Sequence, residues 1–195
     1  MNSPAESNRC RGYPAETESD LKLAELILYI ARISEGDDTF GSTKLNKILF
    51  MADFEAYRKL GSPITGAEYQ SLPHGPAPRR LMPVMEKLCE SGSAAVRIEQ
   101  RFGYEQKRPI ALREPDLSLF SADEIALVDR IVRLLWGFTA RDVSELSHRF
   151  IGWQLAEQGE IIPYGLALLA ADRELSEEGN KVAQELSEYA ASLLP

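Results

Sequence analysis

Apolar residues recur every three or four positions along most of the chain, a spacing that is typical of amphipathic helices. The first such stretch runs from Leu21 to about Ser34, with Asp20 as the expected N-cap and Gly36 as the residue that ends it. Its apolar positions are Leu23, Leu26, Ile27, Ile30 and Ile33. We therefore expect an early helix with one face in the core.

The next helix is expected to be the most buried one. Ser42 or Thr43 is its expected N-cap, it runs over residues 43–59, and Gly61 ends it. Two apolar stripes cover it, one of Leu45, Ile48, Leu49, Ala52 and Ala56, the other of Phe50, Phe54 and Tyr57. Because little of its surface is purely polar, this pattern predicts a central helix.

Shorter elements are predicted after it. Residues 62–78 form a connection with an extended piece at Ala67–Leu72, and a helix follows at Arg79–Glu90. Alternating apolar residues then predict a β-hairpin of Ala94–Gln100 and Tyr104–Arg113. Val96, Ile98, Ile110 and Leu112 are its alternating positions.

The carboxy-terminal half is again helical. Ser121 begins a helix through Trp136, and Thr139 caps a short helix to His148. A loop with Trp153, an apolar segment at 164–170 and a last helix at about 176–194 follow. The fold class is mainly α with a small β-hairpin (α+β). Residues 1–19 are expected to be a disordered leader and 20–195 a single domain.

Composition narrows the class of protein. The chain has 195 residues, 44% of them hydrophobic, and a net charge of −8, which opposes non-specific binding to nucleic acid. Cys10 and Cys89 do not form a disulfide framework, so we expect free thiols in a reducing compartment. No apolar run approaches the roughly 18 residues of a membrane span. These features predict a cytoplasmic protein.

Recognisable catalytic motifs are missing from the sequence. It contains no Walker loop, dinucleotide fingerprint, nucleophile elbow or zinc-ligand pair. An enzyme that assembles a site from His74, Asp53 and Glu68 is kept as an alternative, ranked after a protein-binding domain and a DNA-binding protein. We expect no catalytic activity, no metal and no cofactor.

Two segments are candidates for binding a partner protein. On the central helix, Asn46, Asp53 and Tyr57 share a face and could form a polar seam, although a plain core helix with snorkelling lysines at Lys44 and Lys47 is the stronger interpretation.

The second candidate is the loop Leu72–Pro78. There Gly75 and Pro76 favour a stiff turn that presents His74 beside Tyr69. A purely structural turn is an equally good interpretation of this loop.

A DNA-binding protein is the second alternative. Residues 138–153 resemble half of a helix-turn-helix, and the hairpin with its basic residues could be a wing. These basic residues are Arg97, Arg101, Lys107, Arg108 and Arg113. The short helix, however, offers mainly acidic and hydroxyl side chains instead of the residues that usually read bases.

Three segments in order resemble the Panacea domain, the SocA-like antitoxin family of bacterial and phage toxin–antitoxin systems. Lys44–Asp53 (KLNKILFMAD) is similar to the family's K-L-x-K-L-x-Y-x-A-[DE] helix, with Phe50 in place of tyrosine. Pro63–Pro76 (PITGAEYQSLPHGP) is similar to its I-x-G-x-x-[YF]…G-P signature. The third is L-S-H…W at Leu146–Trp153, after the helix that Ser121 begins. The resemblance extends from about Leu21 to Trp153, most of the chain, and its signature segments are 44–76 and 121–153.

The resemblance implies a helical domain that neutralises a partner toxin. Direct complex formation is the expected mode, and delivery of the toxin to a cellular protease is the alternative mode. The residues expected to contact the partner are Asn46, Asp53, Tyr57, Tyr69, His74, Gly75, Pro76, His148 and Trp153. Nucleic acid and membranes are not expected partners.

Overall fold

The computed structural model describes residues 17–101 and 103–169. The helices are α1 (Glu18–Ile33), α2 (Ser42–Leu60), α3 (Leu81–Glu90), α4 (Ala122–Leu134), α5 (Ala140–His148), α6 (Ile151–Leu155) and α7 (Leu166–Leu169), with a 3-10 turn η1 (Leu117–Leu119). Two antiparallel pairs accompany them: β1 (Tyr69–Gln70) with β2 (Ala77–Pro78), and β3 (Ala94–Arg101) with β4 (Tyr104–Ala111). The prediction of a mainly helical α+β fold is confirmed.

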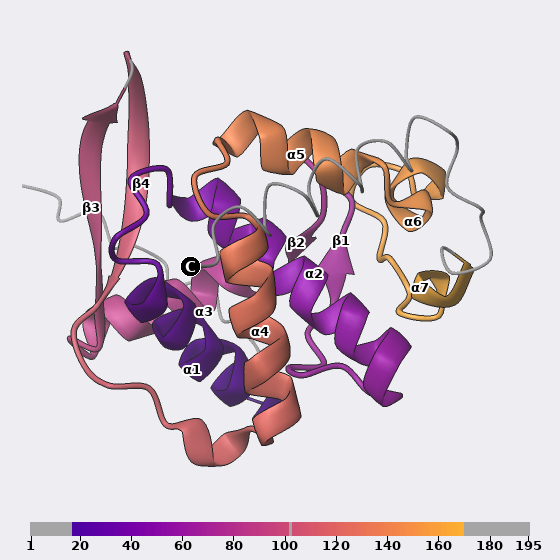
Figure 1. The fold of residues 1–195 in the computed structure, drawn as a ribbon, viewed down its shortest axis with the longest axis horizontal. Coiled ribbons are helices and arrows are strands. Elements are labelled where there is room, and N and C mark those ends of the chain that lie inside the picture. The colour runs from indigo at the N-terminus through magenta and orange to yellow at the C-terminus, as the bar shows by residue number, and fades with distance from the viewer. Residues whose placement is uncertain (1–16, 102, 170–195) are drawn as a thin grey trace, which may run out of the picture.

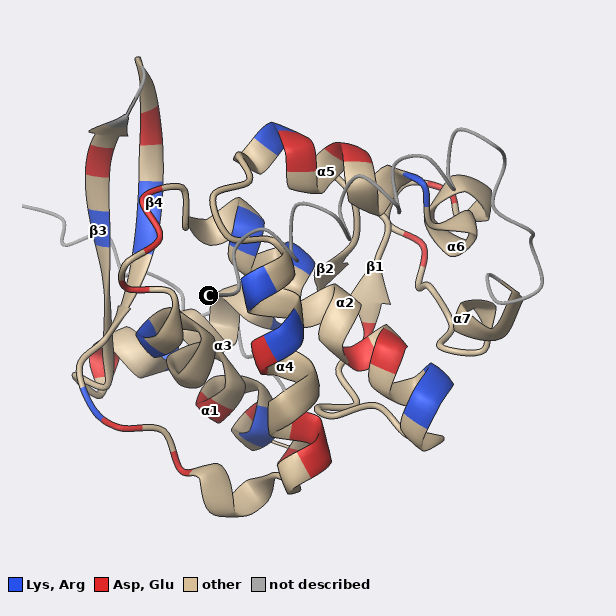
Figure 2. Cartoon of the chain, viewed as in Figure 1, with Lys and Arg blue, Asp and Glu red and all other residues tan. Residues whose placement is uncertain are grey.

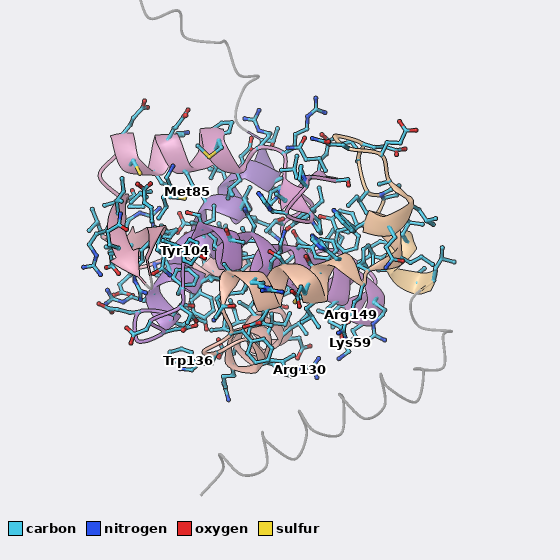
Figure 3. The ribbon with its side chains drawn as sticks, turned by 90° about the horizontal axis from the view of Figure 1, so that it is seen from above. Lys59, Met85, Tyr104, Arg130, Trp136 and Arg149 are labelled. Carbon is cyan, nitrogen blue, oxygen red and sulfur yellow. The ribbon has the colours of Figure 1, made fainter. Side chains whose placement is uncertain are left out.

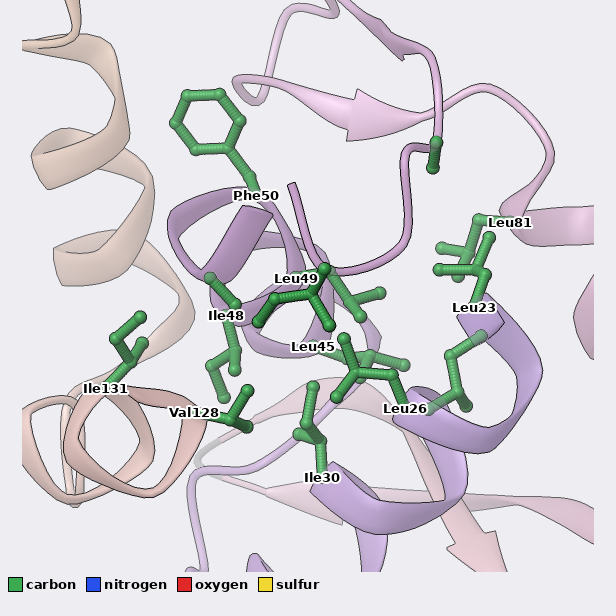
Figure 4. Close-up of a cluster of buried hydrophobic side chains, with 14 of the residues drawn as sticks. Leu23, Leu26, Ile30, Leu45, Ile48, Leu49, Phe50, Leu81, Val128 and Ile131 are labelled. Carbon is green, nitrogen blue, oxygen red and sulfur yellow. The ribbon is translucent and has the colours of Figure 1, made fainter. Parts of the chain in front are cut away.

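Helix α2 lies at the centre of the fold. It contacts α1, α4, α5 and α7 as well as both β pairs, and Figure 1 shows it crossing the middle of the molecule. In the close-up of Figure 4, apolar side chains of α1, α2 and α4 converge on one core: Leu26, Ile30, Leu45, Ile48, Leu49 and Val128. The predicted central buried helix at 43–59 is therefore confirmed.

Helix starts were predicted with mixed success. Ser121 and Thr139 cap α4 and α5 as expected, each in a reciprocal capping box. Asp20 is not the N-cap of α1, because Thr17 is the cap and Asp20 closes its capping box from the third helical position. Gly41, and not Ser42 or Thr43, precedes α2. Residues 17–19 thus belong to α1 and its cap, while the rest of the expected leader, 1–16, lies outside the described residues.

The β3–β4 hairpin projects from one edge of the molecule (Figure 1). Its apolar alternation does not face the core, since Val96 and Ile98 are 42% and 61% exposed. The hairpin is anchored instead by the buried Arg108, whose guanidinium donates to the carbonyls of Ser34, Glu35, Asp37 and Phe40. In the register of the hairpin, Arg108 lies opposite Arg97.

Trp153, expected in a loop, lies in α6, and the expected helix at 176–194 lies outside the described residues. Cys89 is an exposed free thiol. None of the described helices combines the length and the apolar character needed to cross a lipid bilayer.

Candidate functional site

The backbone of residues Leu72–Pro78, here called the 72–78 loop, is held by hydrogen bonds from side chains of α2 and α6. The N–H of Gly75 donates to the carbonyl of Leu72 at 2.8 Å. Trp153 Nε1 also donates to that carbonyl, at 3.1 Å, and Lys47 Nζ donates to the carbonyl of Pro76 at 3.1 Å. His74, between these fixed points, is exposed. The loop therefore presents His74 to solvent from a rigid frame.

Glycine is required at position 75. Its φ is +95°, which disfavours other residues. A Cβ there would lie 2.5 Å from Ser147 Oγ and 2.6 Å from Lys47 Nζ. Gly75 and Pro76 therefore seat the loop on α2 and α5, as the expectation of a stiff turn requires.

Lys47 is the buried charge beneath this loop. Its side chain is 2% exposed, and among residues 17–101 and 103–169 no carboxylate pairs with its ammonium. Burial lowers the pKa of Lys47 to about 8. At neutral pH the loop thus rests on a cation that is desolvated but not neutralised.

His148 and Trp153 support the loop from the side of α5 and α6. Their rings stack with centroids 4.0 Å apart and planes at 9°. Burial lowers the pKa of His148, and the positive charges of Lys47 and His74 lower it further. Its Nε2 is buried without a hydrogen-bond partner in the described part of the chain. Both residues, expected at the partner surface, are half-buried braces of the loop.

Asp53 and Tyr69 form a network inside the core. The N–H and hydroxyl of Thr65 donate to the Asp53 carboxylate at 2.7 and 2.5 Å, and the Tyr69 hydroxyl donates to it at 2.8 Å. Burial raises the pKa of Asp53, although these hydrogen bonds act in the opposite direction. Asp53 is 0% exposed and Tyr69 1%, so neither is accessible to a partner in this conformation. The sequence had suggested that Tyr69 lies on the surface beside His74, and this prediction is wrong.

Asn46 and Tyr57 do not continue a polar surface through Asp53. Tyr57 is half-buried and stacks on Tyr164, with ring centroids 5.7 Å apart. Asn46 is half-buried, and its Oδ1 has no hydrogen-bond partner among the described residues. The seam predicted on α2 is therefore interrupted by the fully buried Asp53.

The geometry gives little support to the two alternative functions, an enzyme and a DNA-binding protein. For an enzyme, Asp53 is enclosed in the core, His74 is exposed, and the exposed Glu68 pairs with Arg79 at 3.5 Å. For a DNA-binding wing, Arg108 is buried, and Arg113 pairs with Glu25 at 2.5 Å. Two of the five basic residues expected on the wing thus have structural roles.

The sequence interpretation missed the buried positions of the lysines. Lys44 and Lys47 do not snorkel, since they are 1% and 2% exposed. Lys44 pairs with Asp37 at 2.5 Å, whereas Lys47 donates to the Pro76 carbonyl and has no carboxylate partner in the part of the chain that the structure describes. A spacing of three places Lys44 and Lys47 on the same helix face, each directly before an apolar residue, Leu45 and Ile48, and that was the available signal.

Comparison with known proteins identifies the family. The model of the family described as antitoxin SocA-like, Panacea domain, matches residues 45–154, more than half of the chain. This range contains most of α2, the 72–78 loop and the bracing residues of α5 and α6. A search among curated proteins finds no match. The resemblance noted in the sequence is confirmed, and the chain belongs to the SocA-like Panacea antitoxin family.

Proposed function

We propose that this protein binds a partner toxin and neutralises it by direct complex formation, without catalysing a reaction. The observation that carries the proposal is the match to the antitoxin family over residues 45–154. The part of the chain that matches contains the 72–78 loop, its exposed His74 and the side chains beneath it. The proposed contact surface is therefore centred on His74.

The rigid frame of the 72–78 loop supports this role. Ordering a flexible side chain or loop on binding costs free energy, about 0.5–1.5 kcal/mol for each immobilised side chain. The backbone on both sides of His74 is already fixed, through the carbonyls of Leu72 and Pro76. A partner that contacts His74 therefore has little of the loop to order.

The unneutralised charge of Lys47 also supports it. A desolvated cation without a carboxylate partner destabilises the folded protein, and such features concentrate at functional sites. The buried Lys47 ammonium makes the region beneath the loop locally positive, in a protein whose net charge is −8. A carboxylate of the partner placed over the 72–78 loop would compensate this charge.

Replacing His74 with alanine is expected to weaken partner binding tenfold or more, about 1.4 kcal/mol, and to leave the fold intact. The side chain is exposed, and exposed substitutions usually change stability by no more than about half a kcal/mol. Calorimetric titration of His74→Ala with the product of the neighbouring reading frame measures the affinity. Thermal melting followed by circular dichroism measures stability.

Glu86→Ala provides the matched control, since Glu86 is an exposed residue of α3, away from the loop. It should bind as tightly as the parent. Parental affinity in His74→Ala would show that the interface lies elsewhere, with the β3–β4 hairpin as the next region to examine. A melting temperature that falls strongly in His74→Ala would show that the loop is structural.

A further inference from the structure

A second surface of the molecule is apolar and hollowed. A groove of about 550 Å³ lies between α2, α4 and α5 and extends to α6 and α7. We call it the α2–α4 groove. Its apolar lining includes Phe50, Phe54, Ile131, Leu134, Leu146 and Phe150. Leu134 is 50% exposed there. An apolar hollow of this kind is typical of a docking site for an amphipathic segment.

The rim of the α2–α4 groove is mainly basic. Arg58 and Arg130 line it together with Glu55, which pairs with Arg58, Lys59 and Arg130. Figure 2 shows basic residues at the end of α2 and along α4, and in Figure 3 Lys59, Arg130 and Arg149 lie at the same edge of the molecule. One acidic side chain thus faces several cations. The occupant that fits this rim is an acidic segment.

The chain itself leads into this surface. Ala167 of α7 lines the groove, and α7 contacts both α2 and α6. Residues 170–195 follow immediately after α7. A segment that begins at the border of the groove is present there at a high effective concentration, compared with any separate molecule.

The sequence of residues 170–195 contains the apolar and acidic side chains that would fit the lining and the rim of the groove. Val182, Leu186, Tyr189 and Leu193 follow at spacings of four, three and four, which places them on one face of a helix. In residues 170–195, acidic residues outnumber basic ones by six to two. The segment therefore combines an apolar stripe for the lining with negative charge for the rim.

We propose that residues 176–194 form an amphipathic helix that docks in the α2–α4 groove of the same chain, with Leu186 and Tyr189 inward. A helix of this length extends about 28 Å, which is sufficient to cross the face of a small domain. Docking covers Leu134 and the aromatic floor, and it neutralises the rim. This face would then be closed to partners, while the 72–78 loop stays accessible. The proposal does not depend on the proposed antitoxin role.

Hydrogen–deuterium exchange of the full-length chain, followed by mass spectrometry, tests the docking. Leu186→Asp places a charge in the apolar stripe and is expected to raise exchange at least about tenfold in residues 176–194. Exchange should also rise in peptides of the groove that contain Met51, Leu134 or Leu146. Gln184→Asp adds the same charge on the opposite helix face and should change neither region.

A reciprocal variant tests the groove itself. Leu134→Asp should release residues 176–194, whereas Met82→Asp, on the exposed face of α3, should not. Rapid exchange of residues 176–194 in the parent would overturn the proposal. The proposal would also be overturned if Leu186→Asp removed the protection of residues 176–194 while exchange in the groove peptides stayed the same. Protection that grows with protein concentration would show that a second copy is the occupant, and protection that appears only after a partner is added would show that the partner is required. Both results would overturn intramolecular docking.

Discussion

Replacing Leu49 with aspartate is expected to unfold the domain. Leu49 is 0% exposed and sits at the middle of α2, among the core side chains of α1 and α4 (Figure 4). The variant loses the leucine contacts, worth about 2–5 kcal/mol, and buries an unpaired carboxylate at a cost of several more. This sum is comparable with the whole stability of a typical domain, about 5–15 kcal/mol. Circular dichroism and thermal melting should show no cooperative transition.

Leu60→Asp is the control for this substitution. Leu60 is the last residue of the same helix and is 44% exposed, so the same chemical change should cost no more than about half a kcal/mol. A cooperative melt of Leu49→Asp near the parental temperature would contradict the placement of α2 at the centre of the core. If the variant unfolds as expected, its loss of toxin binding carries no information about the interface.

Replacing Lys47 with methionine is expected to stabilise the protein at pH 7. Its pKa falls from 10.5 to about 8 because the ammonium is buried, which corresponds to roughly 3 kcal/mol of unfavourable charge burial at 1.4 kcal/mol per pKa unit. Methionine loses the hydrogen bond to Pro76, worth about 1 kcal/mol, but fills a similar volume. A net gain of about 2 kcal/mol should appear in denaturant unfolding.

The gain from Lys47→Met should also depend on pH. Between pH 8 and 10.5 the unfolded chain still holds the lysine proton while the folded chain has released it, so the parent becomes more stable as pH rises through this window. Methionine has no proton to release. The difference between variant and parent should therefore shrink from pH 7 toward pH 10.5.

Lys44→Met is the matched control, with the opposite sign expected. Lys44 pairs with the buried Asp37 carboxylate, which methionine would leave unpaired, at a cost of about 3–5 kcal/mol. A Lys47→Met variant that is less stable than the parent at pH 7 would show that its ammonium is compensated. The same conclusion would follow from a stability difference that does not change with pH.

Local patterns in the sequence predicted the features that local chemistry determines. The two apolar stripes of residues 43–59 indicated that α2 is buried on most sides, and this is its position in the fold. Ser121 and Thr139 were identified as N-caps because the capping box involves only residues three apart. Asp20 was misplaced although the same spacing holds there, since it closes the capping box of Thr17 from the third helical position and also pairs with Arg80 at 2.6 Å.

Contacts between distant segments decided the rest of the candidate site. Asp53 reads as a surface carboxylate on a polar seam, but Thr65 and Tyr69, 12 and 16 residues later, enclose it. Lys47 reads as a snorkelling lysine until the 72–78 loop covers it. In each case the helix itself was predicted, and the segment that covers the side chain was not. His74 alone among the predicted contact residues of the loop is both exposed and held by a fixed backbone.

Neutralisation of a toxin in growing bacteria tests the central claim most directly. The product of the neighbouring reading frame, expressed alone, should stop growth, whereas this protein alone should not. Expressed together, they should restore growth and purify as a complex, with the toxin at an unchanged level if binding alone neutralises it. A toxin level that falls in the presence of this protein would indicate delivery to a protease instead. Arrested growth in spite of co-expression, or toxicity of this protein that its neighbour relieves, would contradict the proposed antitoxin function.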